Sequence, residues 1–300
     1  MSRGRGRASA LVRASHPEPT AAVTGLMTAL AHSAGAPAGR VGLALLAGQL
    51  TTGWSNDWID RDRDRRSARG DKPLVQGVLP AAAIGGAALL AGALSVPLSL
   101  RLGRRAGLLH LAAVGSALSY NAALKGTALS FLPYALSFGA LPSVVVLATP
   151  GGGRAPAWAT AGGALLGVGA HLANALPDLE DDLATGVRGL PHRLGRGRST
   201  ALMAALLLAA TGELALGPAG WPPVLQRREG LALVVAGGLA ATGAGLAHRN
   251  PRSRAAFLAS LAIAGVDVAL LLSQGELLSA GHGPGSPAVR AGGPAGTIGA

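Results

Sequence analysis

The chain lacks cysteine altogether, which excludes disulfide bonds, thiolate metal sites and cysteine nucleophiles. Charged residues are also few, at 13% of the 300 residues, whereas hydrophobic residues make up 49% and the mean hydropathy is +0.40. The apolar residues form repeated blocks of about 20 residues, the length at which a helix crosses ~30 Å of hydrocarbon. These proportions favour a polytopic helical membrane protein.

The formal net charge of +12 does not indicate a nucleic-acid partner. The arginines lie in short segments between the apolar blocks rather than on one surface, as expected for loops beside a lipid bilayer. The 46 glycines, together with many alanines, suit close packing of helices inside lipid.

The hydropathy pattern predicts an all-α fold with about nine transmembrane helices in one bundle. The predicted spans are residues 20–36, 39–55, 78–100, 104–121, 127–149, 156–176, 199–217, 229–248 and 255–274. Residues 1–15 are expected to form a basic disordered arm, residues 16–278 the transmembrane domain, and residues 279–300 a disordered tail rich in Gly and Pro.

The lysines and arginines predict how this bundle is oriented. If the N-terminus is cytoplasmic, 18 of them lie on cytoplasmic segments and 8 lie outside. Positive residues favour the cytoplasmic side, so we expect the N-terminus inside and the C-terminus outside. Arg101, Arg104 and Arg105 are a local exception that this rule does not explain. The abundance of Ala, Gly and Arg points to a GC-rich bacterial source, and hence to the bacterial plasma membrane.

A dense charge cluster, residues 54–73, lies between two of the apolar runs. Within it, Asn56, Asp60 and Asp64 recur at i, i+4 and i+8, a spacing that lines one face of a helix. Carboxylates stacked on one face repel one another. A hard divalent cation such as Mg²⁺ would remove that repulsion, since it binds one or two carboxylates together with substrate phosphates. The alternative is a solvated loop in which the interleaved arginines neutralise the acids.

A second acidic cluster repeats the same spacing with Asn174, Asp178 and Asp182. It also ends an apolar span, on the same predicted side of the membrane, and Pro177 is expected to break the helix there. A solvated loop does not require the same spacing twice. The repeat therefore favours two facing metal sites that together neutralise one diphosphate.

The two motifs, Asn56-Asp57-x-x-Asp60-x-x-x-Asp64 and Asp178-x-x-x-Asp182, resemble those of the UbiA superfamily of intramembrane prenyltransferases. Shorter similarities lie at residues 16–19, 71–77 and 186–195, and at Tyr120 with Lys125. The similarity runs roughly from residue 13 to residue 275. Two features depart from the family pattern: Asp71 stands where relatives often have a neutral residue, and the second motif carries the extra acids Glu180 and Asp181.

The resemblance implies a nine-helix bundle around a central cavity that opens to lipid. It implies Mg²⁺-dependent transfer of a prenyl group from a polyprenyl diphosphate to a lipophilic, often aromatic, acceptor. The expected metal-binding and catalytic residues are Asn56, Asp60, Asp64, Asp178 and Asp182. The expected substrate-binding residues are Lys72, Tyr120, Lys125, Asn174 and Arg193. For Lys72 and Arg193 the alternative is simple retention of positive charge on the cytoplasmic side.

Other polar and aromatic side chains have competing interpretations. An allylic cation could be flanked by Tyr120, Phe131, Tyr134 and Phe138, although aromatic residues in apolar spans more often serve packing. His171 is either a base on the acceptor side or a hydrogen-bonded interior histidine. We expect Asp57, Asp62, Glu180 and Asp181 to be solvated or paired with arginine, and assign Asp267 no role.

Two other functions compete with prenyl transfer. Some superfamily relatives cyclise the prenyl chain without an acceptor, and the low aromatic content, 3%, weakly disfavours such a cation-guiding cavity. Acids within apolar spans also mark transporters. The repeated motif followed by segments that pair a basic residue with proline argues against a transporter.

Overall fold

The computed structural model describes residues 2–66, 72–219 and 225–274. Within these ranges the chain is helical and contains no strand. The helices are α1 (Ser2–Ala14), α2 (Pro17–Ser33), α3 (Ala38–Arg66), α4 (Ala81–Leu100), α5 (Arg104–Ala122), α6 (Leu132–Leu147), α7 (Ala157–Ala175), α8 (Leu179–Ala184), α9 (Leu190–Leu216), α10 (Arg227–Arg249) and α11 (Ala255–Ser273). Short 3₁₀ turns lie at Leu124–Gly126, Leu176–Asp178 and Gly217–Ala219.

Each predicted span overlaps one of these helices, and most bounds agree within a few residues. Two helices are longer than predicted. Helix α3 continues through the charge cluster to Arg66. Helix α9 begins at Leu190 rather than at residue 199, but its first turns are separated from the rest by a kink at Gly195, where φ is 74°. The count of nine transmembrane helices is not confirmed. In the described ranges four helices, α4, α9, α10 and α11, are long and apolar enough to cross a membrane.

The N-terminal segment differs from the expected disordered arm, because residues 2–14 form helix α1. Ala10 and Ala14 are fully buried against a small apolar cluster that includes Leu74 and Ile84. The Trp54 indole of α3 also donates a hydrogen bond to the Leu11 carbonyl, at 2.9 Å. This buried apolar face holds the helix despite its arginines. The predicted tail, residues 279–300, lies outside the described residues.

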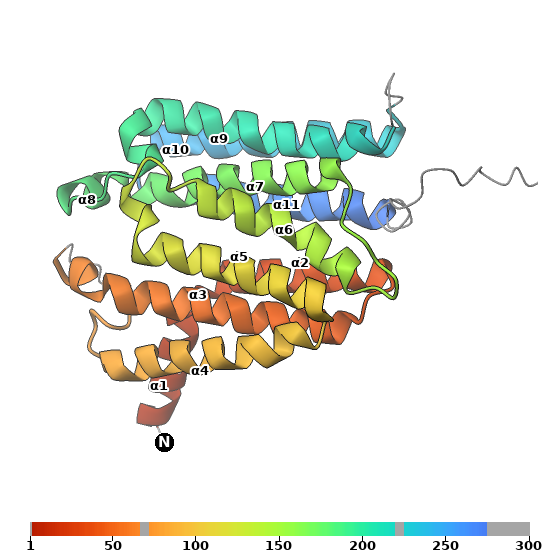
Figure 1. The fold of residues 1–300 in the computed structure, drawn as a ribbon. Coiled ribbons are helices and arrows are strands. Elements are labelled where there is room, and N and C mark those ends of the chain that lie inside the picture. The colour runs from red at the N-terminus through yellow and green to blue at the C-terminus, as the bar shows by residue number, and fades with distance from the viewer. Residues whose placement is uncertain (1, 67–71, 220–224, 275–300) are drawn as a thin grey trace, which may run out of the picture.

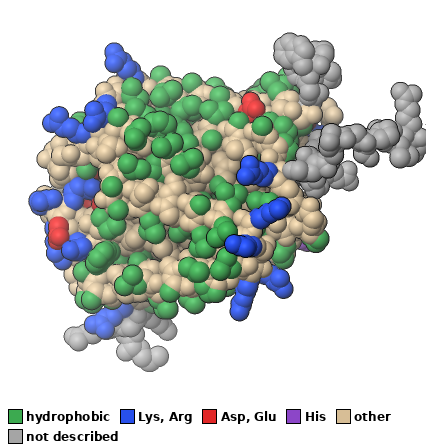
Figure 2. Space-filling model, in the orientation of Figure 1, with side chains coloured by type: hydrophobic (Ala, Val, Ile, Leu, Met, Phe, Trp, Pro, Cys, Tyr) green, Lys and Arg blue, Asp and Glu red, His purple; other side chains and the backbone are tan. Residues whose placement is uncertain are grey.

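The long helices run side by side, and the segments that carry the two acidic motifs lie at the same end of the bundle (Figure 1). The C-terminal end of α3, the connection from α5 to α6, and α8 all lie at this end. Figure 2 shows hydrophobic side chains over the middle of the visible face, with most blue Lys and Arg side chains near its rims. Large apolar side chains are exposed on the bundle, among them Leu89 (77%) and Val234 (73%). A lipid bilayer would cover such a surface.

Glycine lets segments of the bundle approach one another closely. A Cβ at Gly53 of α3 would lie 2.5 Å from the Ser15 carbonyl oxygen, and one at Gly163 of α7 would lie 2.7 Å from that of Phe138. Both distances are too short for a side chain. The high glycine content thus serves the helix contacts that bring distant polar groups together.

Candidate active site

The first acidic motif lies on one uninterrupted helix, because α3 extends to Arg66. Asp60 and Asp64 are each only 6% exposed, and Asn56 is half-buried one turn before Asp60. A buried carboxylate is costly unless positive or hydrogen-bonding groups surround it. The predicted face is therefore held inside the protein, rather than being a solvated loop.

Asp60 is surrounded by donors from two parts of the chain. Lys125 Nζ, on the 3₁₀ turn after α5, donates to Asp60 Oδ2 at 2.6 Å. Asn56 Nδ2 donates to the same oxygen at 3.2 Å, and the Arg63 guanidinium forms an ion pair with it. The sequence suggested Lys125 as a diphosphate ligand; the structure places its ammonium group on the first motif.

The second motif does not lie on a straight helix. Helix α7 ends at Ala175, the 3₁₀ turn Leu176–Asp178 follows, and α8 begins at Leu179. The break expected at Pro177 is confirmed. Asn174, Asp178 and Asp182 keep their sequence spacing, but they follow a bent path rather than one helical face.

Asp182 lies close to the groups that bind Asp60. Burial by itself would raise the pKa of Asp182, but the neighbouring His192 and the positive charges of Lys125 and Arg63 lower it below its ordinary value. His192 Nε2 is 3.4 Å from Asp182 Oδ2. Lys125 and Arg63 therefore act on both acidic motifs.

A pocket also lies between the end of α3 and the segment around α8. Arg66 at the end of α3 and Asp181, Ala184 and Thr185 in and after α8 line this cavity of about 430 Å³. Segments 115 residues or more apart in sequence therefore form its walls. The pocket is polar on both sides, which suits a charged ligand group.

The residues of the two motifs fit Mg²⁺ by their donor chemistry. The available ligands are carboxylate and amide oxygens, which Mg²⁺ prefers, and two of the carboxylates are buried. The described residues contain no group of three or more Asp, Glu or His side chains placed to hold an ion together. Mg²⁺ does not require one, since it commonly uses one or two carboxylates and takes its other ligands from phosphates and water.

An aromatic cluster adjoins the acids. The Tyr120 ring of α5 lies edge-on to the Tyr134 ring of α6, with centroids 5.2 Å apart, and both rings contact His171 of α7. Tyr134 stacks on Phe138, at 6.2 Å. Asn121, the residue after Tyr120, accepts a hydrogen bond from Asn56 of the first motif, so the cluster lies beside the site.

His171 is an interior histidine, as one interpretation of the sequence held. It is 2% exposed, and its Nε2 lies 3.1 Å from Ser130 Oγ. Ser130 also accepts a hydrogen bond from the Leu190 backbone N–H, at 2.8 Å. The α5–α6 connection is thereby joined to the segment that follows the second motif.

Asp57 was expected to be solvated or paired with arginine, and this expectation is wrong. Asp57 is 2% exposed; its Oδ1 lies 2.5 Å from Lys72 Nζ and 3.0 Å from His16 Nε2. The reason is that α1 and the start of α2 cover this side of α3. The spacing of residues along α3 does not show which other segments pack against it. Lys72, expected to bind substrate, is thus paired with a buried carboxylate.

Two predicted substrate-binding residues are exposed in the structure. Asn174 is exposed at the end of α7. Arg193 is also exposed, but its Nε donates to the Arg188 carbonyl, at 2.9 Å, and no contact recorded in the described ranges brings it to the acids.

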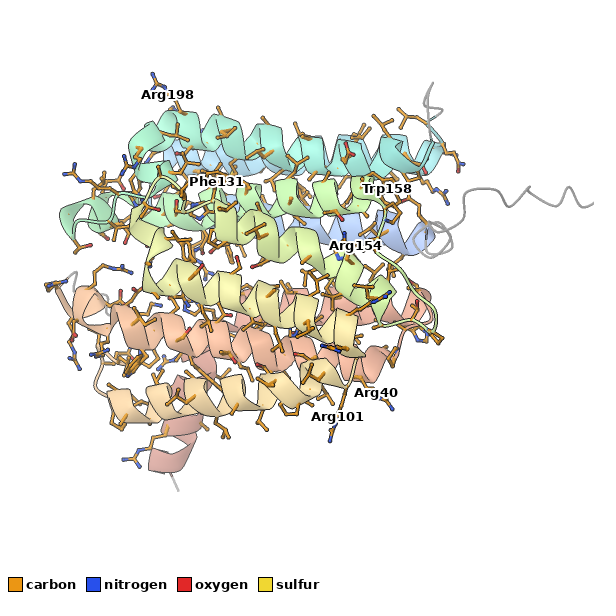
Figure 3. All side chains as sticks on the ribbon, in the orientation of Figure 1. Arg40, Arg101, Phe131, Arg154, Trp158 and Arg198 are labelled. Carbon is orange, nitrogen blue, oxygen red and sulfur yellow. The ribbon has the colours of Figure 1, made fainter. Side chains whose placement is uncertain are left out.

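The extra acids behave largely as expected. Glu180 pairs with Arg196, and Asp62 with Arg61 and Arg65. Asp267, left without a role, accepts a hydrogen bond from Thr211, at 2.7 Å, inside the bundle. Figure 3 shows Arg40, Arg101 and Arg154 at the end of the bundle away from α8, so they are remote from the site.

Sequence reasoning missed two polar residues of this region. Asn121 of α5 bonds the amide of Asn56, and His192 approaches Asp182. Asn121 follows Tyr120 directly, and polar residues within apolar spans are seldom without function. That placement was the available signal.

The comparisons with known proteins agree with this geometry. The sequence profile of the UbiA prenyltransferase family matches residues 19–272. A UbiA homologue from Aeropyrum pernix K1 has a similar structure, with a TM-score of 0.66 and 19% identity, covering 86% of this chain and 98% of the homologue.

A UbiA homologue from Archaeoglobus fulgidus, solved with DMAPP and Mg²⁺, is similar to the same degree. Its TM-score is 0.66 at 16% identity, over 89% of this chain and 98% of that one. The same homologue bound to GPP and Mg²⁺ gives a TM-score of 0.64 at 16% identity, over 90% and 99%. A search of curated proteins found no significant match. With the family profile covering most of its length, the chain belongs to the UbiA prenyltransferase family.

Proposed function

We propose that this protein is a Mg²⁺-dependent membrane prenyltransferase, which moves a prenyl group from a prenyl diphosphate to a small, aromatic acceptor. One observation carries the proposal. Lys125 and Arg63 contact Asp60 of the first motif and also lower the pKa of Asp182 in the second. Family membership and the similar structures solved with DMAPP or GPP and Mg²⁺ support it.

The two motifs would hold the metal. Asn56, Asp60 and Asp64 form one set of oxygen ligands, and Asp178 and Asp182 form the other. Mg²⁺ bound there would supply positive charge to the diphosphate as its bond to the prenyl carbon breaks. The reaction breaks that carbon–oxygen bond, forms a bond from the prenyl carbon to the acceptor, and releases a proton from the acceptor.

Lys125 has a second part in this proposal. Its side chain is 19% exposed and its ammonium group contacts Asp60, where it would also donate to a diphosphate oxygen. Fixed positive groups stabilise developing negative charge most strongly in a site that excludes water. Asn174 and Tyr120 complete the substrate-binding residues that the geometry favours, whereas Lys72 and Arg193 remain predictions from the sequence.

The aromatic cluster is the observation that favours a second candidate function, cyclisation of the prenyl diphosphate. Tyr120, Tyr134 and Phe138 form a surface beside the acids, and aromatic faces stabilise cations such as an allylic cation. Such a surface also serves a cyclase that folds the prenyl chain without an acceptor. Release of a hydrocarbon from geranylgeranyl diphosphate alone would establish cyclisation.

The arrangement at the membrane also belongs to the proposal. We place the two motifs and α1 at the cytoplasmic side of a bacterial plasma membrane, with nine spans and the C-terminus outside. The shared end of the two motifs supports this placement (Figure 1), as does the charge bias of the sequence. A reactive cysteine introduced at Arg198 would then be labelled from the cytoplasm, and one at Arg154 from outside.

The decisive experiment measures diphosphate released by purified protein from geranyl or geranylgeranyl diphosphate, with and without aromatic acceptors and Mg²⁺. We expect release that requires Mg²⁺ and is stimulated by an acceptor. Asp60→Ala and Asp178→Ala should each abolish it in protein that still folds. Full activity in either variant would refute the two-motif mechanism, and no release under any condition would refute the function.

A further inference from the structure

Asn121 joins helix α5 to the first acidic motif. It is 6% exposed, and its Nδ2 donates to the Thr52 carbonyl at 2.9 Å and to Ser55 Oγ at 3.0 Å. Its Oδ1 accepts a hydrogen bond from Asn56 Nδ2, at 3.1 Å. All three partners lie on α3, so a single amide group from α5 contacts one face of the helix that carries the acids.

These partners fix the orientation of both amides. A backbone carbonyl accepts hydrogen bonds and cannot donate them, so the NH₂ group of Asn121 must face Thr52. Its Oδ1 then faces Asn56, which can bond to an oxygen only through its own NH₂ group. That NH₂ group also donates to Asp60 Oδ2. The Asn56 Oδ1 atom is therefore turned away from Asn121 and Asp60.

The same network leaves one oxygen of Asp60 available. Asn56, Lys125 and Arg63 all contact Oδ2 of Asp60. The described part of the chain supplies no hydrogen bond to Asp60 Oδ1 or Asn56 Oδ1. Two oxygens one helical turn apart thus keep their lone pairs for another ligand, and hard divalent cations prefer such oxygens.

We propose that Asn121 is a positioning residue, which holds the Asn56 carboxamide with its oxygen available to the divalent cation. This inference rests on the proposed function, because it assumes that the first motif binds Mg²⁺ together with a diphosphate. Hydrogen-bond partners behind metal ligands commonly fix ligand orientation in this way. Without Asn121, only the hydrogen bond to Asp60 would restrain the Asn56 amide, which could then rotate and present its NH₂ group to the cation.

Asn121 could instead serve only to join α5 to α3. Three variants distinguish this structural role from the positioning role. Asn121→Ala removes every hydrogen bond of the amide. Asn121→Asp keeps an oxygen that accepts from Asn56 Nδ2. Ser55→Ala removes one α3–α5 hydrogen bond and leaves the Asn121–Asn56 contact intact, so it is the matched control.

The readout is binding of geranyl diphosphate to purified protein as a function of Mg²⁺ concentration, with thermal unfolding measured separately without Mg²⁺. We expect Asn121→Ala to raise the Mg²⁺ concentration for half-maximal binding roughly 10- to 100-fold. Asn121→Asp and Ser55→Ala should stay near the wild-type value, even where they lower the unfolding temperature.

An Asn121→Ala variant with the Mg²⁺ requirement of Ser55→Ala would overturn the inference, whatever its unfolding temperature. If Asn121→Asp requires as much Mg²⁺ as Asn121→Ala, orientation of Asn56 is not the cause and the inference also fails. If the wild-type protein binds no geranyl diphosphate at any Mg²⁺ concentration, the proposed function itself has failed. The wild-type binding curve therefore distinguishes the two failures.

Discussion

Lys125 and Asp60 lie 65 positions apart in the chain, and their side chains meet at 2.6 Å. The contact joins the turn after α5 to the helix that carries the first acidic motif. The same lysine also lowers the pKa of Asp182, in the second motif. One ammonium group thus links three segments that the sequence keeps far apart, and it lies where the proposed diphosphate would bind.

We expect replacement of Lys125 to act mainly on the reaction rate rather than on the stability of the fold. Lys125→Met keeps a long side chain but removes the charge, and removal of one fixed donor to a developing negative charge costs roughly 100- to 1,000-fold in rate. Diphosphate release at saturating Mg²⁺ is the measurement. Arg40→Gln, at the opposite end of the bundle, is the control and should turn over normally. An unchanged rate in Lys125→Met would remove this lysine from the mechanism.

The pair Asp57–Lys72 should contribute to stability more than an exposed pair does. Asp57 is 2% exposed and Lys72 is 13% exposed, so Asp57→Ala leaves a largely buried ammonium group unpaired. Loss of one partner of a buried ion pair costs about 3–5 kcal/mol. Unfolding in detergent micelles would measure this.

Two further variants test the interpretation of that loss. Asp57→Ala combined with Lys72→Met should be less destabilised than the sum of the single variants, since no charge is left unpaired. Asp62→Ala, whose side chain is 62% exposed beside Arg65, should cost less than about 1 kcal/mol. Equal losses for Asp57→Ala and Asp62→Ala would contradict the burial argument.

Tyr134 should act through its ring rather than its hydroxyl. Tyr134→Phe keeps a ring beside Tyr120 and Phe138, whereas Tyr134→Leu removes it. A cation over an aromatic face gains about 0.5–2 kcal/mol, so the Leu variant should lose roughly threefold to 30-fold in kcat. The rates of the two variants, measured at saturating prenyl diphosphate, decide between ring and hydroxyl. Equal rates in Phe and Leu variants would exclude a cation–π role.

Gly189 should be needed for the contact between the two halves of the site. A Cβ at this position would lie 2.6 Å from the Lys125 carbonyl oxygen and 2.9 Å from Ser130 Oγ. Gly189→Ala must therefore push the segment after the second motif away from the α5–α6 connection. We expect it to cost about 1–3 kcal/mol of stability and to lower diphosphate release.

The matched control for that substitution is Gly197→Ala. A Cβ at Gly197 meets no other atom within 4 Å, and the residue lies within helix α9, where alanine is favoured. This variant should unfold at or above the wild-type temperature. If both glycine variants behave alike, close approach at Gly189 has no special importance.

Much of the helical arrangement follows from the sequence. Apolar runs of nearly membrane length predicted where the long helices lie, because each run must satisfy its own backbone hydrogen bonds in lipid. The runs gave no signal for α1, whose arginines conceal a narrow apolar face of small residues, Ala10 and Ala14 among them. They also gave no signal for the short helix α8, although Pro177 predicted the break that separates it from α7.

The sequence by itself determined that two Asn-x-x-x-Asp-x-x-x-Asp motifs end apolar helices, because helical periodicity is a local property of the chain. Only the tertiary structure decided which acids are paired with which cations. Asp57 and Asp60 are three residues apart on α3, yet one contacts Lys72 and His16 and the other Lys125. Burial and charge partners depend on which distant segments pack against a helix face, and no spacing within α3 encodes them.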